Sequence, residues 1–195
     1  MALRQLFSRN SDFVTKEDVT LWIYDSNDTP PTTFVIKKNK KVNILESATK
    51  WWKIGYKNTK GYASKYYFVQ RGAEEHEKQL WYFGDISRSD SEEILTQNGN
   101  SEGSFLVRRK SNQYIISVKK YEAIDAVFRI RHYKILDENG KYWLHENQKF
   151  DNISHLMEYF QQYDLDEYLT EYDDGESKAS TNNHLLIESI IQCNK

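Results

Sequence analysis

The stretch from Gly103 to Lys110, "GSFLVRRK", constrains the fold more than any other part of the chain. Its three consecutive large apolar residues, 105–107, are typical of a strand in a sheet that is covered on both faces. Successive side chains of a strand point to opposite faces, so Arg108 and Arg109 must have different surroundings. We expect one guanidinium group to point to solvent and the other into the protein, where an unpaired charge is costly.

The composition argues against several classes of protein. A formal charge of −2 over 195 residues gives no overall positive field for nucleic acid. The single cysteine, Cys193, allows no internal disulfide, and no Cys/His set has zinc spacing, which favours a cytoplasmic protein without metal or other cofactor. No signal peptide and no apolar stretch of about 18 residues is present, so we expect no transmembrane segment.

The first half of the chain predicts a small all-β domain at residues 15–70, after a loose N-terminus at 1–14. Turn formers at 26–28 and 57–61 separate short β-type runs. These runs predict five strands in a tightly coiled barrel, at 19–24, 33–36, 42–45, 51–56 and 66–69.

A charged linker is predicted at 71–79, and an α+β domain at 80–172. Ser89 and Glu92 have capping-box spacing and predict a helix over 89–99. Strands follow at 112–120, 127–136 and 141–144, the last two joined by an Asn139-Gly140 hairpin turn. Apolar residues spaced i, i+3, i+4 and i+7 predict a second helix over 153–160. The sequence therefore predicts a central antiparallel sheet flanked by two helices.

A polar tail is predicted at 173–195. Within it the apolar run "HLLIESII", at 184–191, fits either a frayed end or a docking segment.

Four fragments of the second block together resemble a Src-homology 2 (SH2) domain over residues 80–172. They occur in family order with suitable gaps and read "WYFGDISRSDSEEIL", "GSFLVRR", "IRHYKI" and "KFDNISHLMEYF". The resemblance implies that Arg108 reaches into a pocket of the sheet and binds a phosphotyrosine. A planar guanidinium can donate a bidentate pair of hydrogen bonds to phosphate, which lysine cannot imitate. We expect the ligand-free pocket to be open to water; the alternative is an arginine held in a structural salt bridge.

The resemblance also assigns further phosphate-side residues. Arg88 on the first helix would flank the phosphate, unless it is a solvated arginine at a helix start. His132 and Lys134 match phosphate-side positions on one face of a strand, and a core hydrogen-bonding role for His132 remains open. The loop "RKSNQ" is shorter than that of the family and lacks its glycine, so Lys110, Ser111 and Asn112 are expected to substitute as donors.

Peptide specificity is assigned by the same resemblance. Tyr133 corresponds to an aromatic residue of Src-like members, which prefer an apolar residue three places after the phosphotyrosine. Leu144, His145 and Leu165 would edge that pocket. Plain packing is the alternative for each of these residues.

The first block resembles a Src-homology 3 (SH3) domain over residues 17–70. The similarity rests on "IYD" (23–25), "FVIKKN" (34–39), "WW" (51–52) and "GYASKYYF" (61–68). It implies a groove for polyproline-II peptides lined by Tyr24, Trp51 and Tyr67, with Trp52 facing the other way. For Trp51 the alternative is a half-buried strand tryptophan.

Three groove positions depart from the SH3 pattern: Ser26, Thr33 and Ser64 replace a tyrosine, an acidic residue and a proline. Each change removes contact area or a charge pair, so we expect weak or atypical proline-rich peptide binding. A purely structural role for this domain is the alternative.

Together these features predict a non-catalytic signalling adaptor whose partners are tyrosine-phosphorylated proteins, such as receptors, scaffolds or kinases. The alternative is a truncated or regulatory relative of a Src- or Tec-type tyrosine kinase that competes with or restrains such enzymes. No glycine-rich loop, HRD or DFG follows residue 172, and no nucleophile has an evident base, so no enzyme activity is expected.

Overall fold

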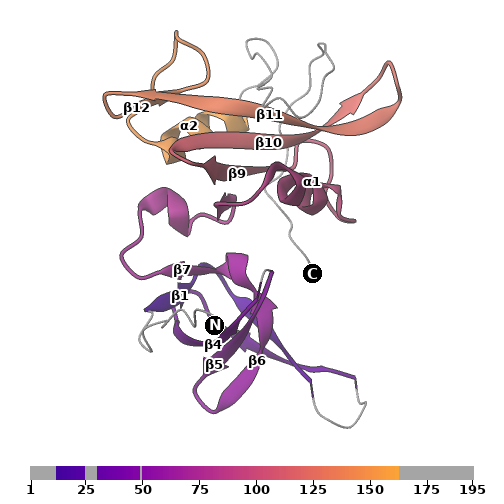
Figure 1. Cartoon of the computed structure of the whole chain (residues 1–195), viewed down its shortest axis with the longest axis vertical. Coiled ribbons are helices and arrows are strands. Elements are labelled where there is room, and N and C mark those ends of the chain that lie inside the picture. Colours follow the sequence, from indigo (N-terminus) through magenta and orange to yellow (C-terminus); the bar gives the residue numbers. More distant parts are fainter. Residues whose placement is uncertain (1–11, 25–29, 49, 163–195) are drawn as a thin grey trace, which may run out of the picture. The chain divides into compact units, whose positions relative to one another are not determined.

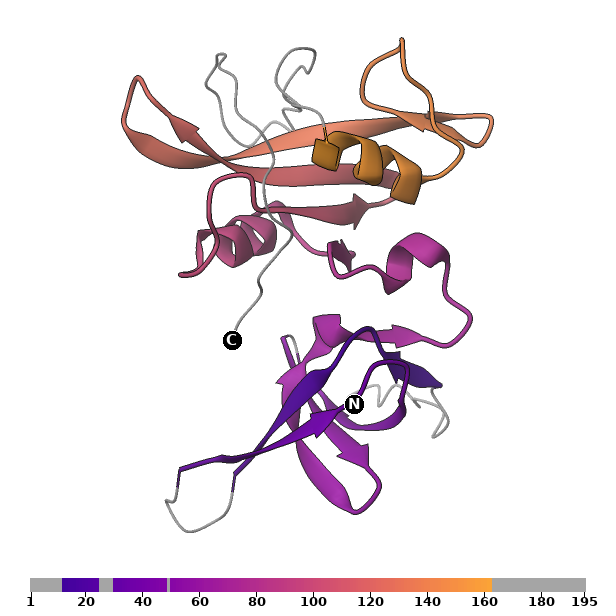
Figure 2. The same ribbon diagram turned by 180° about the vertical axis from the view of Figure 1, so that it is seen from behind.

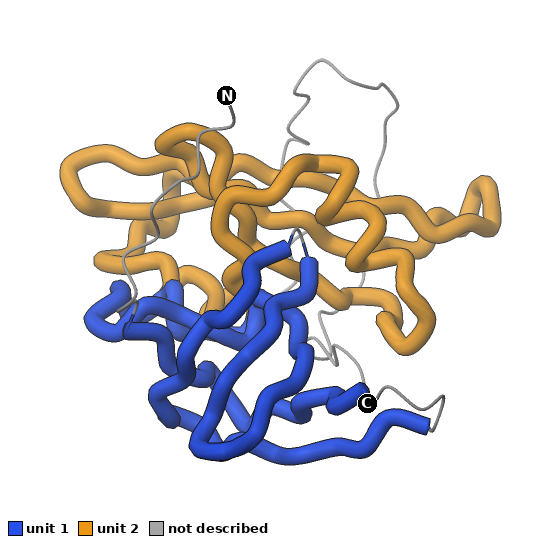
Figure 3. Tube along the Cα trace, turned by 60° about the horizontal axis from the view of Figure 1, so that its bottom comes forward, with its two compact units in different colours: residues 1–80 blue, residues 81–195 orange. Residues whose placement is uncertain are grey.

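The computed structural model describes residues 12–24, 30–48 and 50–162. The chain divides between Leu80 and Trp81 into two compact units, coloured separately in Figure 3. Among the described residues, the first unit is all-β and the second combines one sheet with two helices (Figure 1). This confirms the predicted fold class of an SH3-like β unit followed by an SH2-like α+β unit.

The strands of the first unit pair antiparallel in one sheet of order β3-β2-β6-β5-β4-β1-β7. They are β1 (Phe13–Thr15), β2 (Val19–Ile23), β3 (Thr32–Ile36), β4 (Lys41–Ser47), β5 (Trp51–Tyr56), β6 (Thr59–Ser64) and β7 (Phe68–Gln70). The alternation of side chains along these strands buries one face. Its core consists of Val19, Leu21, Ile36, Val42, Ile54, Ala63 and Phe68.

The predicted turn at 57–61 is too long. Tyr56 pairs with Thr59, so only two residues form the turn and the following six form the unforeseen strand β6. Gly61 lies inside this strand, where a Cβ atom would be 3.0 Å from the Trp22 carbonyl oxygen. The glycine therefore permits the close approach of β2. From the sequence alone, the same glycine indicates a turn.

Two other boundaries of the first unit also differ from prediction. Residues 66–67 belong to a 3-10 turn, η1 (Lys65–Tyr67), because the chain must turn between β6 and β7 before Phe68 enters the core. Strand β1 begins at Phe13, inside the segment predicted to be loose, because Phe13 packs its ring 5.2 Å from that of Trp52. Tertiary contact overrides local pattern at both places.

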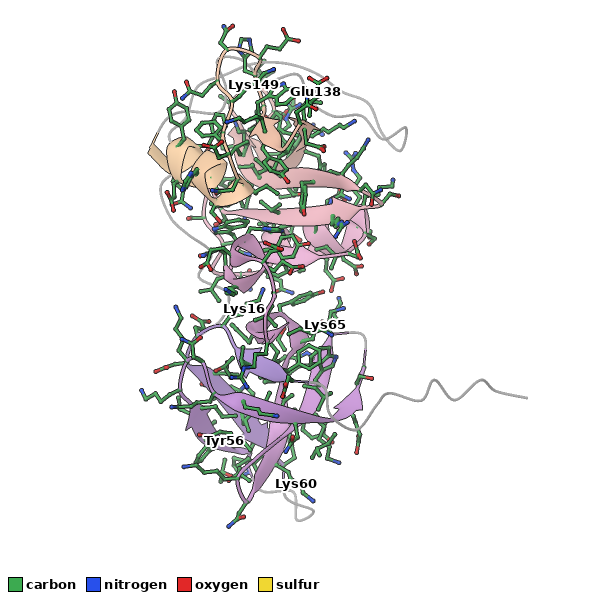
Figure 4. All side chains as sticks on the ribbon, turned by 90° about the vertical axis from the view of Figure 1, so that its left-hand side faces the viewer. Lys16, Tyr56, Lys60, Lys65, Glu138 and Lys149 are labelled. Atoms are coloured by element: carbon green, nitrogen blue, oxygen red, sulfur yellow. The ribbon has the colours of Figure 1, made fainter. Side chains whose placement is uncertain are left out.

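The segment predicted as a linker makes ordered contacts within the first unit. It contains a second 3-10 turn, η2 (Glu75–Lys78), which begins with a capping box between Glu74 and Glu77. Lys16, labelled in Figure 4, is buried and donates from Nζ to the Gln79 carbonyl oxygen at 3.2 Å. Burial lowers the pKa of Lys16 to about 8, although Glu77 acts in the opposite direction.

The second unit has a five-stranded sheet of order β12-β11-β10-β9-β8, in which only the β8–β9 pair is parallel. Its strands are β8 (Tyr82–Gly84), β9 (Phe105–Lys110), β10 (Gln113–Glu122), β11 (Val127–Glu138) and β12 (Lys141–Trp143). The helices are α1 (Arg88–Thr96) and α2 (Ile153–Gln162). Helix α2 lies behind β10 and β11 in Figure 1 and in front of them in Figure 2.

Local signals predicted much of this unit correctly. Asn139 and Gly140 both have positive φ, 52° and 74°, and join β11 to β12 as a two-residue turn. The apolar positions predicted on α2, Ile153, Leu156, Met157 and Phe160, are all buried. No helix of the described residues is long and apolar enough to cross a membrane.

The start of helix α1 corrects the predicted capping box. Ser87 is the N-cap residue: its hydroxyl accepts from the Asp90 amide at 2.9 Å, and the Asp90 carboxylate accepts from the Ser87 amide at 3.4 Å. The N-cap therefore lies two residues earlier than predicted, and Glu92 is not part of the cap. This leaves the Glu92 carboxylate available for contacts with the sheet.

Candidate phosphate-binding site

Arg108 lies on the α1 face of the sheet. Its cross-strand partner is Ile115, which in turn pairs with Lys134, and such partners project to the same side. The side-chain alternation adds Lys110 and His132 to this face. The register therefore brings four of the predicted phosphate-binding residues onto one face of β9 and β11.

Arg109 occupies the opposite face. Its guanidinium carbon is 5.8 Å from the Tyr114 ring centroid, and its Nε donates to the Ser111 carbonyl oxygen at 3.1 Å. The two adjacent arginines thus have different surroundings, as alternation predicts.

Arg108 is buried in this structure, which corrects the expectation that it lies in a pocket open to water. Only 1% of Arg108 is exposed. A buried guanidinium needs compensating charge, and a carboxylate, that of Glu92, lies in the same cluster. The sequence analysis assigned Glu92 to the helix cap and so missed it.

Glu92 connects α1 to the sheet. Its Oε1 accepts from Arg88 Nε at 2.9 Å and lies 3.1 Å from His132 Nε2. The spacing of Arg88 and Glu92, four residues apart on a helix, could have revealed the first of these contacts. The second joins residues 40 positions apart and has no local signal.

His132 is fully buried and both of its ring nitrogens are engaged. Nδ1 lies 2.9 Å from the Ser117 hydroxyl, and Nε2 faces the Glu92 carboxylate. Because a carboxylate only accepts, Nε2 carries the proton and Nδ1 accepts from Ser117. The core hydrogen-bonding role that the sequence left open for His132 is therefore present.

The pKa of His132 is lowered to about 4, first by burial and then by the positive charge of Arg88. Arg108 lowers this pKa further, whereas the hydrogen bond to Glu92 raises it. His132 is consequently neutral near pH 7. The positive charge of the site therefore comes from its arginines and lysines and not from His132.

The loop after Arg108 is reduced to a tight hairpin. Lys110 pairs with Gln113, so only Ser111 and Asn112 connect β9 to β10, and Ser111 has φ of 57°. Lys110 and Ser111 are both exposed. A two-residue turn supplies few backbone N–H groups to surround an anion, so the site relies on its side chains.

The residues predicted to select the peptide are mostly packed. Tyr133 is 5% exposed, lies on the face opposite Arg108, and has Lys120 Nζ 5.9 Å from its ring centroid. Leu144 is buried and His145 is half-buried. Leu165 lies outside the described residues. In this structure Tyr133 and Leu144 are packed side chains, as in the alternative to a specificity role.

The predicted groove residues of the first unit differ in exposure. Tyr24 and Trp51 are exposed, whereas Tyr67 packs against the core. Tyr24 meets the ring of Tyr62, which the sequence analysis did not single out, at 6.0 Å. Trp51 lies on β5 opposite Ser64.

Of the other positions that the sequence analysis named in the first unit, some lie within the described residues and some do not. Trp52 faces inward as predicted and stacks on Phe68 at 6.0 Å. Thr33 is exposed on β3, and Ser26 lies outside the described residues. The N-terminus at 1–11 and the predicted tail at 173–195 also lie outside them.

Comparison with known proteins identifies the second unit. The family described as the SH2 domain matches residues 81–160. Residues 81–160 form an SH2 domain. Its match begins at Trp81, the first residue of the second unit, and includes the whole Arg88–Arg108–His132 cluster.

The chain is also similar to the tyrosine-protein kinase Fgr of Mus musculus. The two are 30% identical over 149 residues, which is 73% of this chain. The aligned part is 28% of the length of that kinase. An alignment of this extent exceeds the SH2 match and includes residues of the all-β unit, in agreement with an SH3–SH2 arrangement.

Proposed function

We propose that this chain is a non-catalytic signalling adaptor that binds tyrosine-phosphorylated proteins through an SH2 domain extending over residues 80–172. The observation that carries this proposal is Arg108, a buried arginine on the α1 face of the sheet with Arg88 in the same cluster. Two guanidinium groups match the two negative charges of a phosphotyrosine.

The assigned roles follow from position. Arg108 binds the phosphate at the base of the pocket, and Arg88 approaches it from the helix. Lys134 and Lys110 add positive charge on the same face, and Ser111 offers a hydroxyl at the tip of the hairpin. His132 supports the pocket from beneath through Ser117 and Glu92. Receptors, scaffolds or kinases that carry phosphotyrosine are the proposed partners.

The experiment is a titration of the full chain with a degenerate phosphotyrosine peptide pool and with its dephosphorylated twin. We expect saturable binding of the phosphorylated pool and at least tenfold weaker binding of the twin, because a charge-assisted pair contributes roughly 1.5–3 kcal/mol. Equal affinity for the two pools would refute the proposal.

For the first unit, residues 15–70, we propose weak or atypical binding of proline-rich peptides through the exposed rings of Tyr24 and Trp51. Tyr67 contributes less than the family pattern implies because it packs on the core. Chemical-shift mapping with a proline-rich peptide tests this. Shifts confined to Tyr24, Trp51 and their neighbours support a groove, and no shifts support a purely structural role.

A second candidate function is regulation of a Src- or Tec-type tyrosine kinase, as a competitor for its phosphotyrosine ligands. The similarity to Fgr favours it. The test adds the purified chain to such a kinase that a phosphotyrosine peptide has activated, and measures phosphorylation of a substrate. A dose-dependent loss of activity, abolished by Arg108→Ala, supports competition.

A further inference from the structure

Glu92 is the carboxylate of the arginine cluster. Its Oε1 is shared between Arg88 Nε and His132 Nε2, at 2.9 and 3.1 Å. Both arginines act electrostatically on His132, so Glu92 lies among three basic side chains. It is a negative group through which α1 contacts this part of the sheet.

Glu92 also forms the outer edge of the cluster. Its side chain is 42% exposed, whereas that of Arg88 is 12% exposed and that of His132 is fully buried. Arg108 itself is 1% exposed. Glu92 is therefore more accessible to an anion from solvent than Arg88, His132 or Arg108.

The helix does not need Glu92 for its start. The capping box is made by Ser87 and Asp90, which satisfies the first amides of α1. The position of Glu92 in the arginine cluster is thus independent of helix capping. The side-chain contacts of Glu92 are made with Arg88 and His132 of the candidate phosphate-binding site.

We propose that Glu92 is an internal counter-anion that occupies the Arg88 side of the phosphotyrosine site and must be displaced from Arg88 when phosphate binds. This inference rests on the proposed function and adds a residue that limits affinity. Carboxylate and phosphate compete for the same guanidinium donors because both accept charge-assisted hydrogen bonds.

His132 keeps the displaced carboxylate near the bound phosphate. Its Nε2–H is buried and uses Glu92 Oε1 as acceptor, so swinging Glu92 into solvent would leave that donor without a bond. The carboxylate therefore stays close and repels the phosphate. Glu92 therefore offsets the charge of Arg88 in this structure and, by the same charge, weakens the binding of phosphate.

The substitution Glu92→Gln separates charge from shape. Glutamine has the same length and keeps a carbonyl oxygen that can accept from Arg88 and His132, but it carries no charge. We expect Glu92→Gln to bind the phosphotyrosine peptide pool about fivefold more tightly than wild type, the scale of one partly exposed ion pair and its repulsion. Binding of the dephosphorylated pool should not change.

Glu93→Gln is the matched control. It makes the same change of net charge one residue along α1, on an exposed side chain. A gain specific to Glu92 therefore excludes a general effect of net charge. In the Arg88→Ala background the gain from Glu92→Gln should be smaller than in the wild-type background, because the competition for that guanidinium no longer exists and only the repulsion of the phosphate remains.

The titrations give distinct outcomes for this inference and for the proposed function. Tighter phosphate-dependent binding by Glu92→Gln but not by Glu93→Gln supports the inference. Phosphate-dependent binding by wild type that Glu92→Gln leaves unchanged or weakens overturns the inference alone. Absence of phosphate-dependent binding in wild type and in Glu92→Gln overturns both, and binding present only in Glu92→Gln supports both.

Discussion

Acidification should destabilise the SH2 unit through His132. Its pKa is lowered from the ordinary 6.5 to about 4 in the folded state, mainly because the ring is buried. The unfolded chain therefore binds more protons than the native protein between these two values. Stability from this group is complete above pH 6.5 and is lost as the pH falls toward 4.

The size of the effect follows from the shift. One pKa unit corresponds to about 1.4 kcal/mol, so lowering the pH from about 7 to about 5 should remove about 2 kcal/mol of unfolding free energy. The full loss, near pH 4, is about 3 kcal/mol. The exposed carboxylates with lowered pKa, such as Asp151, titrate below this range and add little above pH 5.

The assay is urea unfolding at several pH values, followed by hydrogen exchange of β10 and β11 so that only the SH2 unit is reported. The variant His132→Asn should have lower stability at neutral pH but a much flatter pH dependence. His155→Gln, which removes an exposed histidine of α2, should keep the wild-type slope. An equal slope in wild type and His132→Asn would refute the assignment.

Two further predictions concern the cores of the two units. Lys16 has its pKa lowered to about 8 by burial, so the first unit should gain stability as the pH rises from about 8 to about 9.5, and Lys16→Met should abolish this gain in thermal unfolding. An unchanged pH dependence in Lys16→Met would argue against the burial of Lys16. Leu156→Ala on α2 should cost about 2–5 kcal/mol of unfolding free energy for the SH2 unit, because the side chain is fully buried. Glu158→Ala, exposed on the same helix, should cost far less in the same urea titration, and equal costs would contradict the packing of α2.

Features that depend on neighbouring residues could be predicted from the sequence. The Asn139-Gly140 turn requires two residues with positive φ, and the apolar spacing of α2 allows one buried face. The opposite orientations of Arg108 and Arg109 follow from the geometry of any strand. These properties are set locally, so the fold class could be predicted.

The capping box shows where local information is insufficient. Ser87 with Asp90 and Ser89 with Glu92 both have the required spacing, and the local preference for glutamate at the third helical position favours the pair that the structure does not use. The structure uses the first pair because Glu92 contacts Arg88 and His132 instead. The contact with His132 spans 40 residues and exists only after α1 packs on the sheet.

Tertiary packing also explains the other differences. Gly61 is needed where β6 approaches the Trp22 carbonyl, although glycine ordinarily indicates a turn. The burial of Arg108 depends on what covers the sheet, which strand alternation does not specify. Exposure of a site residue is therefore the property that sequence predicted least well.

The most direct test of the central claim compares Arg108→Lys with Arg109→Lys in titrations of the full chain with the phosphotyrosine peptide pool. Both variants keep the charge and differ only in the face of β9 that they alter. The account predicts that Arg108→Lys loses roughly 1.5–3 kcal/mol of binding free energy, because lysine cannot donate a bidentate pair, while Arg109→Lys binds within about twofold of wild type. Equal losses in the two variants, or phosphopeptide binding by Arg108→Lys at wild-type affinity, would contradict the placement of the phosphate at Arg108.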